Sequence, residues 1–398
     1  MNPPFHLMVV FVFLPFSIIA TDVRGDEDER WLTSSGHGLM FHYEAFKSHS
    51  PASYNQAVNS FDVTRFADEV ASTNAGHVIF VIGQHWGRYC APNSVYEKLL
   101  DVPAGVWTSK RDLILEIGQE LRKRDVKLIL YMTARAPMRH YHIIVAMGDT
   151  LPSINGKPAG PDINTMSHPR KVKGFRRSEN QPPNPIFLKN WGDVCGEWSK
   201  RYGPLVSGWW FDGYKIEMKN AYEELRSEQY NIDTWIRAVR SGNSNAELAF
   251  NAGAHPSLSL CTAGKLCPHQ TFTAGESHEF FQKLKKGKGK PLTPSNFPAP
   301  KGVVWHLLLP VSDGWGSGTA SRFSSEELTE RVDVINAEGG IVTFDVPIAA
   351  DGTIPEKVLR TLRTFGDNVQ QHTAHPWLHR GLSVEVGWKP TSQSVVSD

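Results

Sequence analysis

The sequence has few features that would direct it to nucleic acid or to a metal. Its 42 Lys and Arg residues almost balance 41 Asp and Glu residues, for a formal net charge of +1, so a broad attraction to nucleic acid is not expected. Only four cysteines occur. None of them forms a Cys-x-x-Cys pair, which disfavours a structural zinc site. With 40% hydrophobic and 21% charged residues, the composition is typical of a globular enzyme or binding protein.

Long hydrophobic runs are equally scarce. Residues 7–20 (LMVVFVFLPFSIIA) form one apolar block, which is too short to span a bilayer comfortably. The block ends at Ala20 and a polar stretch follows, so residues 1–20 are interpreted as a signal peptide. Because no Lys or Arg precedes the block, an uncleaved or lipid-retained form is the alternative. We expect a secreted or periplasmic protein with no membrane span in its mature form.

Export permits disulfide bonds. Cys261 and Cys267 flank a short loop that contains glycine, and we expect a local disulfide between them. Zinc ligation by Cys and His residues of this loop is the alternative, although the spacing does not favour it.

Eight short apolar segments, each followed by a helical pattern or a long loop, recur along the chain. They are GLMFHY (38–43), GHVIFVIG (76–83), VKLILYMT (126–133), SGWWFDGY (207–214), ELAFNAG (247–253), TFTAGE (271–276), GVVWHLLLP (302–310) and GGIVTFDVP (339–347). Helices are predicted over 61–75, 111–124, 187–201, 218–240, 325–337 and 355–365. Eight such units predict an α/β fold, a single (β/α)8 TIM barrel over residues 30–370. The turn after the first segment, HYEAFKSHSP, lacks the Gly-rich phosphate loop of an open doubly wound sheet.

Two loops, residues 134–186 and 285–302, are long and rich in proline, glycine and basic residues. They are either solvated basic loops or subsites for an anionic or branched glycan. Residues 371–398 form a C-terminal extension that is too short for a β-sandwich domain.

Polar residues cluster near the carboxyl ends of the predicted strands, where the active sites of (β/α)8 barrels lie. These residues are His42, Tyr43, His85, Trp86, Tyr131, Asp212, Asn251, Glu276, His306 and Asp345. Polar groups at the ends of apolar strands cost desolvation energy unless they have partners. Their concentration at one end therefore indicates a functional barrel mouth rather than scattered core polar groups.

Two carboxylates in this set are candidates for a catalytic pair, because strands two apart in a barrel can place their side chains across a shared pocket. Asp212 ends the aromatic run that includes Trp210, and Glu276 ends the segment two strands later. Retaining glycosidases hold two carboxyl groups about 5–5.5 Å apart, one as the nucleophile and one as the acid/base. A structural cap on the next helix is the alternative role for Asp212, and Glu279 is the weaker candidate for the acid/base. The 12 tryptophans are compatible with sugar stacking and equally with a large core.

These segments, in this order, resemble the retaining α-L-fucosidase family of glycoside hydrolases over roughly residues 30–370. The resemblance covers GLMFHY, AGHVIFVIGQHWGRYC (75–90), YGPLVSGWWFDG (202–213), SDGWG (312–316) and SSEELTERVDVINAEGGIVTFDVPIAADGTIPE (324–356). It implies that Asp212 is the nucleophile and that Glu276 serves as acid/base. It further implies a fucosylated glycan as the partner, no cofactor and no metal. The implied sugar-binding residues are His42, Tyr43, His85, Trp86, Tyr131, Trp210, Asn251, His306 and Trp315.

The chain departs from the family pattern in several places. The second-strand motif HHDG keeps only His85, which Trp86 follows. His306 stands nine residues before Trp315, where typical members have a glutamate, and the arginine expected near Asn251 is missing. The usual C-terminal β-sandwich is also missing. These departures describe a divergent, barrel-only relative.

Three functions are therefore compatible with the sequence. The favoured one is an exo-acting retaining glycosidase for α-L-fucose or a related sugar. The second is a carbohydrate-binding barrel without catalytic activity, as the altered second-strand motif allows. The third is a metal-dependent hydrolase that uses His42, His85 and Asp212.

Overall fold

The computed structural model describes residues 30–43, 50–135, 140–160, 172–176, 181–261, 267–277 and 290–374. The predicted signal peptide, Glu279 and all of the predicted C-terminal extension after residue 374 lie outside these ranges. Among the described helices, none is both long enough and apolar enough to cross a membrane.

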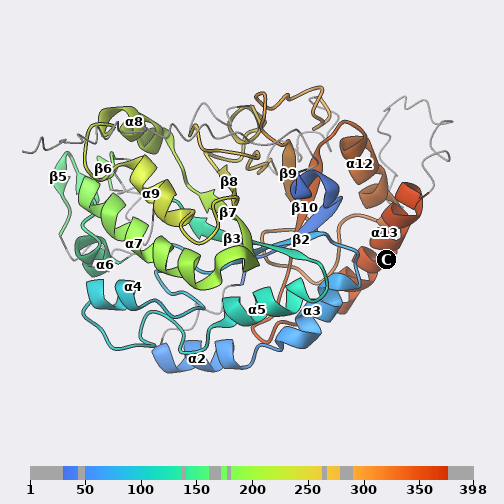
Figure 1. The fold of residues 1–398 in the computed structure, drawn as a ribbon, viewed down its shortest axis with the longest axis horizontal. Helices are drawn as coiled ribbons and strands as arrows, with labels where there is room; N and C mark the ends of the chain where they lie inside the picture. The colour runs from blue at the N-terminus through green and yellow to red at the C-terminus, as the bar shows by residue number, and fades with distance from the viewer. Residues whose placement is uncertain are drawn as a thin grey trace, which may run out of the picture. The chain divides into compact units, whose positions relative to one another are not determined.

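A curled parallel sheet forms the centre of the fold (Figure 1). Its strands are β1 (His37–Phe41), β2 (His77–Val81), β3 (Lys127–Thr133), β7 (Val206–Asp212), β8 (Glu247–Phe250), β9 (His306–Pro310) and β10 (Ile341–Val346). They are arranged in the order β8-β7-β3-β2-β1-β10-β9. Strand β10, the last of these described strands, pairs in parallel with β1, the first, so that Met40 lies opposite Asp345. The sheet therefore curls back on itself, as a barrel requires.

The predicted sixth strand, residues 271–276, lies between β8 and β9 and completes the (β/α)8 barrel with an irregular segment. It makes two isolated parallel bridges to the β9 side, from Phe272 to Val304 and from Glu276 to Leu308. On its other side, the Thr271 N–H donates to the Leu248 carbonyl over 2.8 Å. The Leu248 N–H in turn donates to the Thr271 hydroxyl over 2.7 Å. A side-chain hydroxyl here takes the place of a backbone acceptor, which interrupts the regular ladder.

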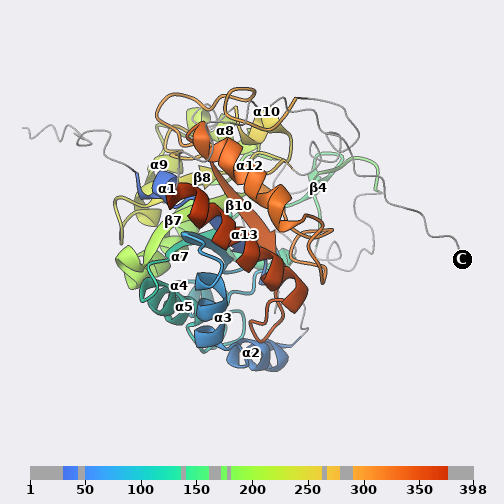
Figure 2. The ribbon, with the colours of Figure 1, turned by 90° about the vertical axis from the view of Figure 1, so that its right-hand side faces the viewer.

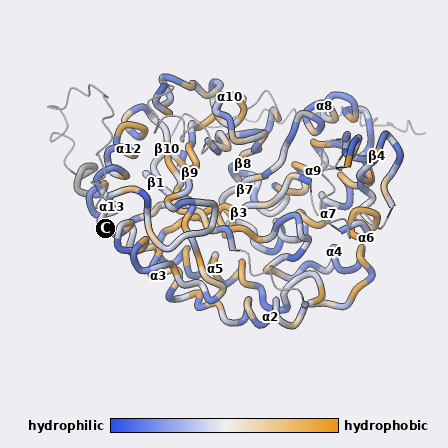
Figure 3. The backbone as a smooth tube through the Cα atoms, turned by 180° about the vertical axis from the view of Figure 1, so that it is seen from behind, coloured by the Kyte–Doolittle hydropathy of each residue, from blue (hydrophilic) through white to orange (hydrophobic). Residues whose placement is uncertain are grey.

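Helices cover the outside of the barrel. They are α1 (Trp31–Ser34), α2 (Pro51–Asn59), α3 (Val63–Ala71), α4 (Ser94–Leu99), α5 (Leu113–Arg122), α6 (Tyr141–Ala146), α7 (Pro185–Tyr202), α8 (Ile216–Glu224), α9 (Ile232–Val239), α10 (Pro256–Ser259), α12 (Ser325–Ala337) and α13 (Glu356–Ala374). Hydrophilic and hydrophobic residues alternate along α3 and α5 (Figure 3), as expected for helices that bury one face. Helices α12 and α13 lie over β10 (Figure 2).

Two helix predictions had different outcomes. The helix predicted over 325–337 is confirmed as α12, which begins with a capping box in which Ser324 and Glu327 make both reciprocal hydrogen bonds. The single helix predicted over 218–240 is wrong, because α8 ends at Glu224 and α9 begins at Ile232. Asn231 caps α9 in a capping box with Thr234, and this local hydrogen bonding starts a new helix.

The long loop after β3 contains structure that the sequence did not indicate. Strands β4 (Ser153–Ile154), β5 (Lys157–Pro158) and β6 (Phe175–Arg176) form a small antiparallel sheet. A buried ion pair holds the base of this loop. Arg135 donates to both carboxylate oxygens of Asp149, over 2.7 and 2.6 Å. The described part of the loop is therefore not merely a solvated basic segment.

The predicted disulfide is wrong for this structure, since Cys261 and Cys267 are not bonded to each other. Cys267 is buried beside Tyr214, and burial raises the pKa of its thiol to about 12. Cys261 is only half-buried. A thiol packed in the protein interior is protonated and unreactive, which disfavours disulfide formation.

Candidate active site

Asp212, the last residue of β7, is the centre of a hydrogen-bond network at the carboxyl ends of the strands. The Tyr131 hydroxyl donates to its Oδ2 over 2.8 Å. The Asn251 side-chain amide donates to its Oδ1 over 2.8 Å, and the Gly213 N–H donates to the same oxygen over 2.9 Å. Hydrogen bonds to an ionised acceptor are strong, so these donors both orient the carboxylate and stabilise its charge.

Glu276 lies next to Asp212 because of a sharp bend in the sixth segment. Gly275 has φ +76°, and a Cβ at this position would lie 2.3 Å from the His306 carbonyl oxygen, so only glycine fits. The Asn251 amide nitrogen that donates to Asp212 also donates to Oε2 of Glu276. Two oxygens hydrogen-bonded to one nitrogen lie at most about 6 Å apart. Asn251 therefore holds the two carboxylates close together.

His42 and Asp345 extend the site across β1 and β10. Asp345 is fully buried, and its Oδ1 lies 2.5 Å from Nδ1 of His42. Its Oδ2 accepts from the Gly316 N–H over 2.6 Å. The His42 ring contacts Tyr131 edge-on at 5.5 Å between centroids and lies 5.7 Å from the Trp315 ring. His42 thereby links Trp315 to the Tyr131–Asp212 network.

Tyr131 and Trp210 form an aromatic wall beside the nucleophile candidate. Their rings stack at 5.2 Å with an interplanar angle of 17°, and both side chains are almost fully buried. The Trp210 indole N–H donates to the Ala274 carbonyl over 3.0 Å. This bond ties β7 to the segment that carries Glu276, so the wall also fixes the spacing of the two carboxylates.

Tyr43 does not belong to the site, and its predicted placement there is wrong. Its ring packs against Phe61 and Phe80, and its hydroxyl donates to the Ala350 carbonyl over 3.0 Å. Successive residues of an extended segment point to opposite faces. Since His42 faces Tyr131 inside the barrel, Tyr43 faces the layer between strands and helices.

His306 also lies away from the site, and its predicted placement there is wrong. It is the first residue of β9, opposite Ile341 at the start of β10, so it lies at the amino ends of the strands. Its Nδ1 lies 2.9 Å from the Thr273 carbonyl, and its Nε2 lies 2.8 Å from the Thr343 hydroxyl. Complete burial lowers its pKa to about 4. His306 is a neutral core histidine in this structure.

His85 and Trp86 follow β2 in a loop above the carboxyl end of that strand. His85 is half-buried, whereas the Trp86 side chain is 44% exposed and its ring lies 6.2 Å from the His140 ring. The sequence pattern places Asp345 at the barrel mouth without assigning it a role, whereas the structure pairs it with His42. The available signal was an aspartate inside an otherwise apolar strand, which requires a polar partner. Within the described ranges, no cluster of three or more metal-ligating side chains is found.

The sequence matches the model of the α-L-fucosidase family over residues 16–374. The chain belongs to the α-L-fucosidase family. No curated protein matches this member of the family in sequence.

Several solved structures share its fold. The endo-fucoidan hydrolase MfFcnA4 of glycoside hydrolase family 107 is 16% identical, with a TM-score of 0.58 over 85% of this chain and 53% of that chain. The α-L-fucosidase AlfC from Lactobacillus casei, in complex with its α-L-fucose product, is 14% identical, with a TM-score of 0.53 over 86% of this chain and 98% of that chain. This family member therefore spans about half of MfFcnA4 and nearly all of AlfC.

Proposed function

We propose that this protein is a retaining, exo-acting glycoside hydrolase for α-L-fucosides, with Asp212 as the nucleophile and Glu276 as the acid/base. The observation that carries the proposal is the single Asn251 nitrogen shared by Asp212 and Glu276. It holds the closest oxygens of the pair within about 6 Å of each other, which supports the short separation, about 5–5.5 Å, between the carboxyl groups of retaining glycosidases. Membership of the α-L-fucosidase family supports the choice of sugar.

The chemistry proceeds in two displacements. In the first, an Asp212 oxygen forms a bond to the anomeric carbon while the bond to the leaving oxygen breaks, and Glu276 transfers its proton to that oxygen. In the second, Glu276 removes a proton from water, the water oxygen bonds to the anomeric carbon, and the carboxylate of Asp212 is released. Tyr131 donates to Oδ2 of Asp212 and Gly213 to Oδ1. These donors stabilise the carboxylate when it departs.

Replacement of Asp212 by glycine tests the nucleophile. We expect Asp212→Gly to lower kcat on an aryl α-L-fucoside by several orders of magnitude, with an unchanged circular dichroism spectrum. Added azide should restore turnover by attacking the anomeric carbon from the vacated side. The control is Asp193→Asn, which removes an exposed carboxylate of α7 without placing a glycine in the helix. The assignment would be contradicted if azide failed to restore turnover, or if a covalent label were found on another residue.

Replacement of Glu276 tests the acid/base. A sugar alkoxide is a poor leaving group that needs protonation, a contribution of about 10²–10⁴-fold. Glu276→Gln should therefore slow a fucosylated disaccharide far more than an activated aryl fucoside, measured as the ratio of the two kcat/KM values. Equal losses on both substrates would remove the role from Glu276.

We also propose that the protein is exported to the periplasm or the extracellular space. The apolar block at residues 7–20, with Ala20 at its end, supports this proposal. N-terminal sequencing of the protein recovered from its native host tests it, and a chain that retains residue 1 inside the cell would contradict it.

A further inference from the structure

The barrel has a seam between β8 and the sixth segment, residues 271–276. Among the described residues, the backbone hydrogen bonds between these two elements all go to the Leu248 carbonyl, toward the amino end of β8. Nearer the mouth, the segment is bonded to β9 instead, where the Leu308 N–H donates to the Gly275 carbonyl over 3.0 Å. The segment that carries Glu276 is therefore joined to β9 by backbone bonds and to β8 by other means.

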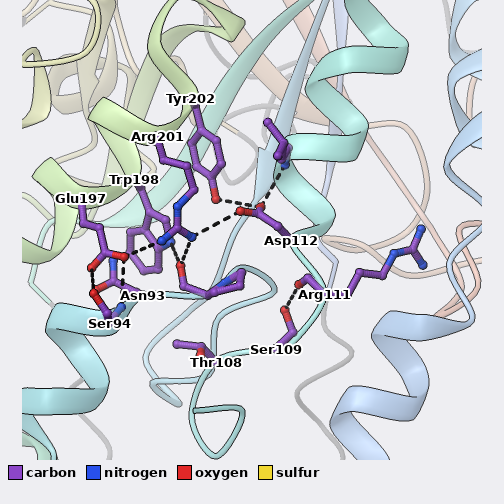
Figure 4. Close-up of polar contacts among 12 residues, drawn as sticks. Asn93, Ser94, Thr108, Ser109, Arg111, Asp112, Glu197, Trp198, Arg201 and Tyr202 are labelled. Atoms are coloured by element: carbon purple, nitrogen blue, oxygen red, sulfur yellow. Dashed lines mark hydrogen bonds and ion pairs between the residues drawn. The ribbon is translucent and has the colours of Figure 1, made fainter.

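Asp212 lies on the other side of this seam, on a strand whose position is fixed. Strand β7 pairs in parallel with both β3 and β8. The end of helix α7, which leads into β7, is bound to Asp112 (Figure 4). The Tyr202 hydroxyl donates to Oδ1 of Asp112 over 3.0 Å, and Arg201 donates to Oδ2 over 3.3 Å. The distance between Asp212 and Glu276 therefore depends on the groups that cross the seam.

The Trp210 side chain crosses the seam between positions that match on its two sides. Trp210 lies two residues before Asp212, and Ala274 lies two residues before Glu276. The Trp210 indole N–H donates to the Ala274 carbonyl over 3.0 Å. On the strand between them, the residue in register with Trp210 is Ala249, which has the smallest side chain of β8. This small residue leaves room for the indole to reach the next segment.

Asn251 also crosses the seam, but the strength of its bond to Glu276 changes during the proposed reaction. A hydrogen bond to a carboxylate is stronger when the carboxylate is ionised, and Glu276 loses and regains a proton in each cycle. The bond between Trp210 and the Ala274 carbonyl joins two neutral groups, so its strength stays the same. Tyr131 stacks on the indole at 5.2 Å between ring centroids and holds it in place. The indole is therefore the constant spacer between the two sides.

We propose that Trp210 is a positioning residue that sets the distance of Glu276 from Asp212. The inference rests on the proposed function, because it requires Glu276 as the acid/base. A buried indole N–H usually has a hydrogen-bond partner, so a purely structural bond is the alternative. Misplacement of a catalytic group by about 1 Å can cost about 100-fold in rate, so loss of a positioning bond has a measurable effect.

Trp210→Phe tests the proposal, because it keeps an aromatic ring and removes the N–H. We expect the ratio of kcat/KM for a fucosylated disaccharide to kcat/KM for an activated aryl α-L-fucoside to fall about tenfold, since a misplaced acid slows the poorer leaving group more. Trp305→Phe is the matched control. It removes a bond of the same kind, from a buried indole to the Phe297 carbonyl over 2.8 Å, and should leave the ratio unchanged. An indole that only contacts the sugar would lower both kcat/KM values equally, and that result would overturn the proposal.

Two further variants test whether the indole acts through Glu276. Ala249→Val places bulk beside the indole and should lower the same ratio, which keeps the test open if Trp210→Phe does not fold. In the Glu276→Gln background no acid remains to be positioned, so adding Trp210→Phe should lower the ratio no further. Independent, multiplicative losses in the double variant would contradict the proposal.

Hydrogen–deuterium exchange separates failure of this proposal from failure of the proposed function. The Gly275 N–H donates across the seam to the Ser259 carbonyl over 3.1 Å, so its exchange reports how firmly the seam is held. We expect this amide to exchange about tenfold faster in Trp210→Phe and at the wild-type rate in Trp305→Phe. Equal exchange in the wild type and Trp210→Phe would overturn the proposal, whatever the activities. If the wild-type chain hydrolyses neither substrate, the proposed function fails, and the exchange rates still decide whether Trp210 holds the segment.

Discussion

At the level of single residues, the buried carboxylate of Asp345 determines which ring nitrogen of His42 carries a proton. An ionised aspartate only accepts hydrogen bonds, so the His42 Nδ1 atom, 2.5 Å from Oδ1, carries a proton. In the neutral ring, Nε2 is then an acceptor, a form that suits a sugar hydroxyl as the donor. The Gly316 N–H occupies the other carboxylate oxygen, so Asp345 cannot turn away without losing a second bond.

Asp345→Asn should reverse this arrangement. The carboxamide oxygen remains opposite the Gly316 N–H, which places the amide NH₂ against Nδ1 of His42. His42 must then accept at Nδ1 and carry its proton on Nε2. We expect kcat/KM for an aryl fucoside to fall about tenfold or more, as the cost of leaving a polar group mismatched implies, and ¹⁵N NMR to report the changed tautomer. Asp193→Asn on the surface is the control. An unchanged tautomer would contradict the argument.

The sequence placed Asp212, Glu276, Asn251, Tyr131 and Trp210 at one barrel mouth, and the structure brings them together. This was possible because a polar residue that ends an apolar strand has few other places to lie. The two misplacements have separate causes. The position of Tyr43 depends on which side of the chain faces the barrel interior after β1 has ended. The position of His306 depends on where its strand begins. The apolar segment 302–310 starts four residues before β9, so His306 begins the strand instead of lying near its end.

At the level of elements, the sixth segment shows why a barrel can be predicted while one of its strands is irregular. The pattern TFTAGE correctly indicated where the sixth segment lies in the barrel. Its threonines, however, use their hydroxyls in the ladder, and Gly275 bends the chain at positive φ. Local side-chain bonding of this kind competes with regular pairing. The small sheet β4–β6 was missed for another reason, since two-residue strands carry no periodicity.

Thr273→Val tests the role of these hydroxyls. The Thr273 Oγ1 accepts from the His306 N–H over 2.7 Å and donates to the His306 carbonyl over 2.7 Å, in a fully buried position. Valine has nearly the same shape but leaves both backbone groups without this partner. We expect the free energy of unfolding to fall by about 1–3 kcal/mol, measured by urea denaturation. Thr364→Val on the exposed face of α13 should change it by less than about 0.5 kcal/mol.

For the molecule as a whole, closure of the barrel buries several histidines far from the candidate site. His77 and His306 both lie 2.8 Å from the single Thr343 hydroxyl, and His37 packs against Phe365 at 4.5 Å between ring centroids. Burial lowers the pKa of His37 and of His306 to about 4, and it lowers the pKa of His77 well below its ordinary value. At any pH between the pKa of the folded protein and that of the unfolded chain, each ring is neutral when the protein is folded and charged when it is unfolded.

The fold should therefore lose stability in mild acid. A histidine with a pKa near 6.5 when unfolded and about 4 when folded takes up a proton more readily in the unfolded state. Its contribution is fully present above about pH 6.5 and is lost progressively as pH falls to about 4. The loss amounts to about 3 kcal/mol for His306, at about 1.4 kcal/mol for each pH unit of difference.

Urea unfolding measured at intervals between pH 7.5 and 4 tests this prediction. Stability of the wild-type protein should decline steeply below pH 6.5. His37→Phe, which keeps an aromatic ring against Phe365, should flatten the slope by close to one proton between pH 6.5 and 4. His255→Gln removes an exposed histidine and should leave the slope unaltered. Parallel curves for the wild type and His37→Phe would show that His37 is protonated in the folded state, and the burial argument would then fail for this residue.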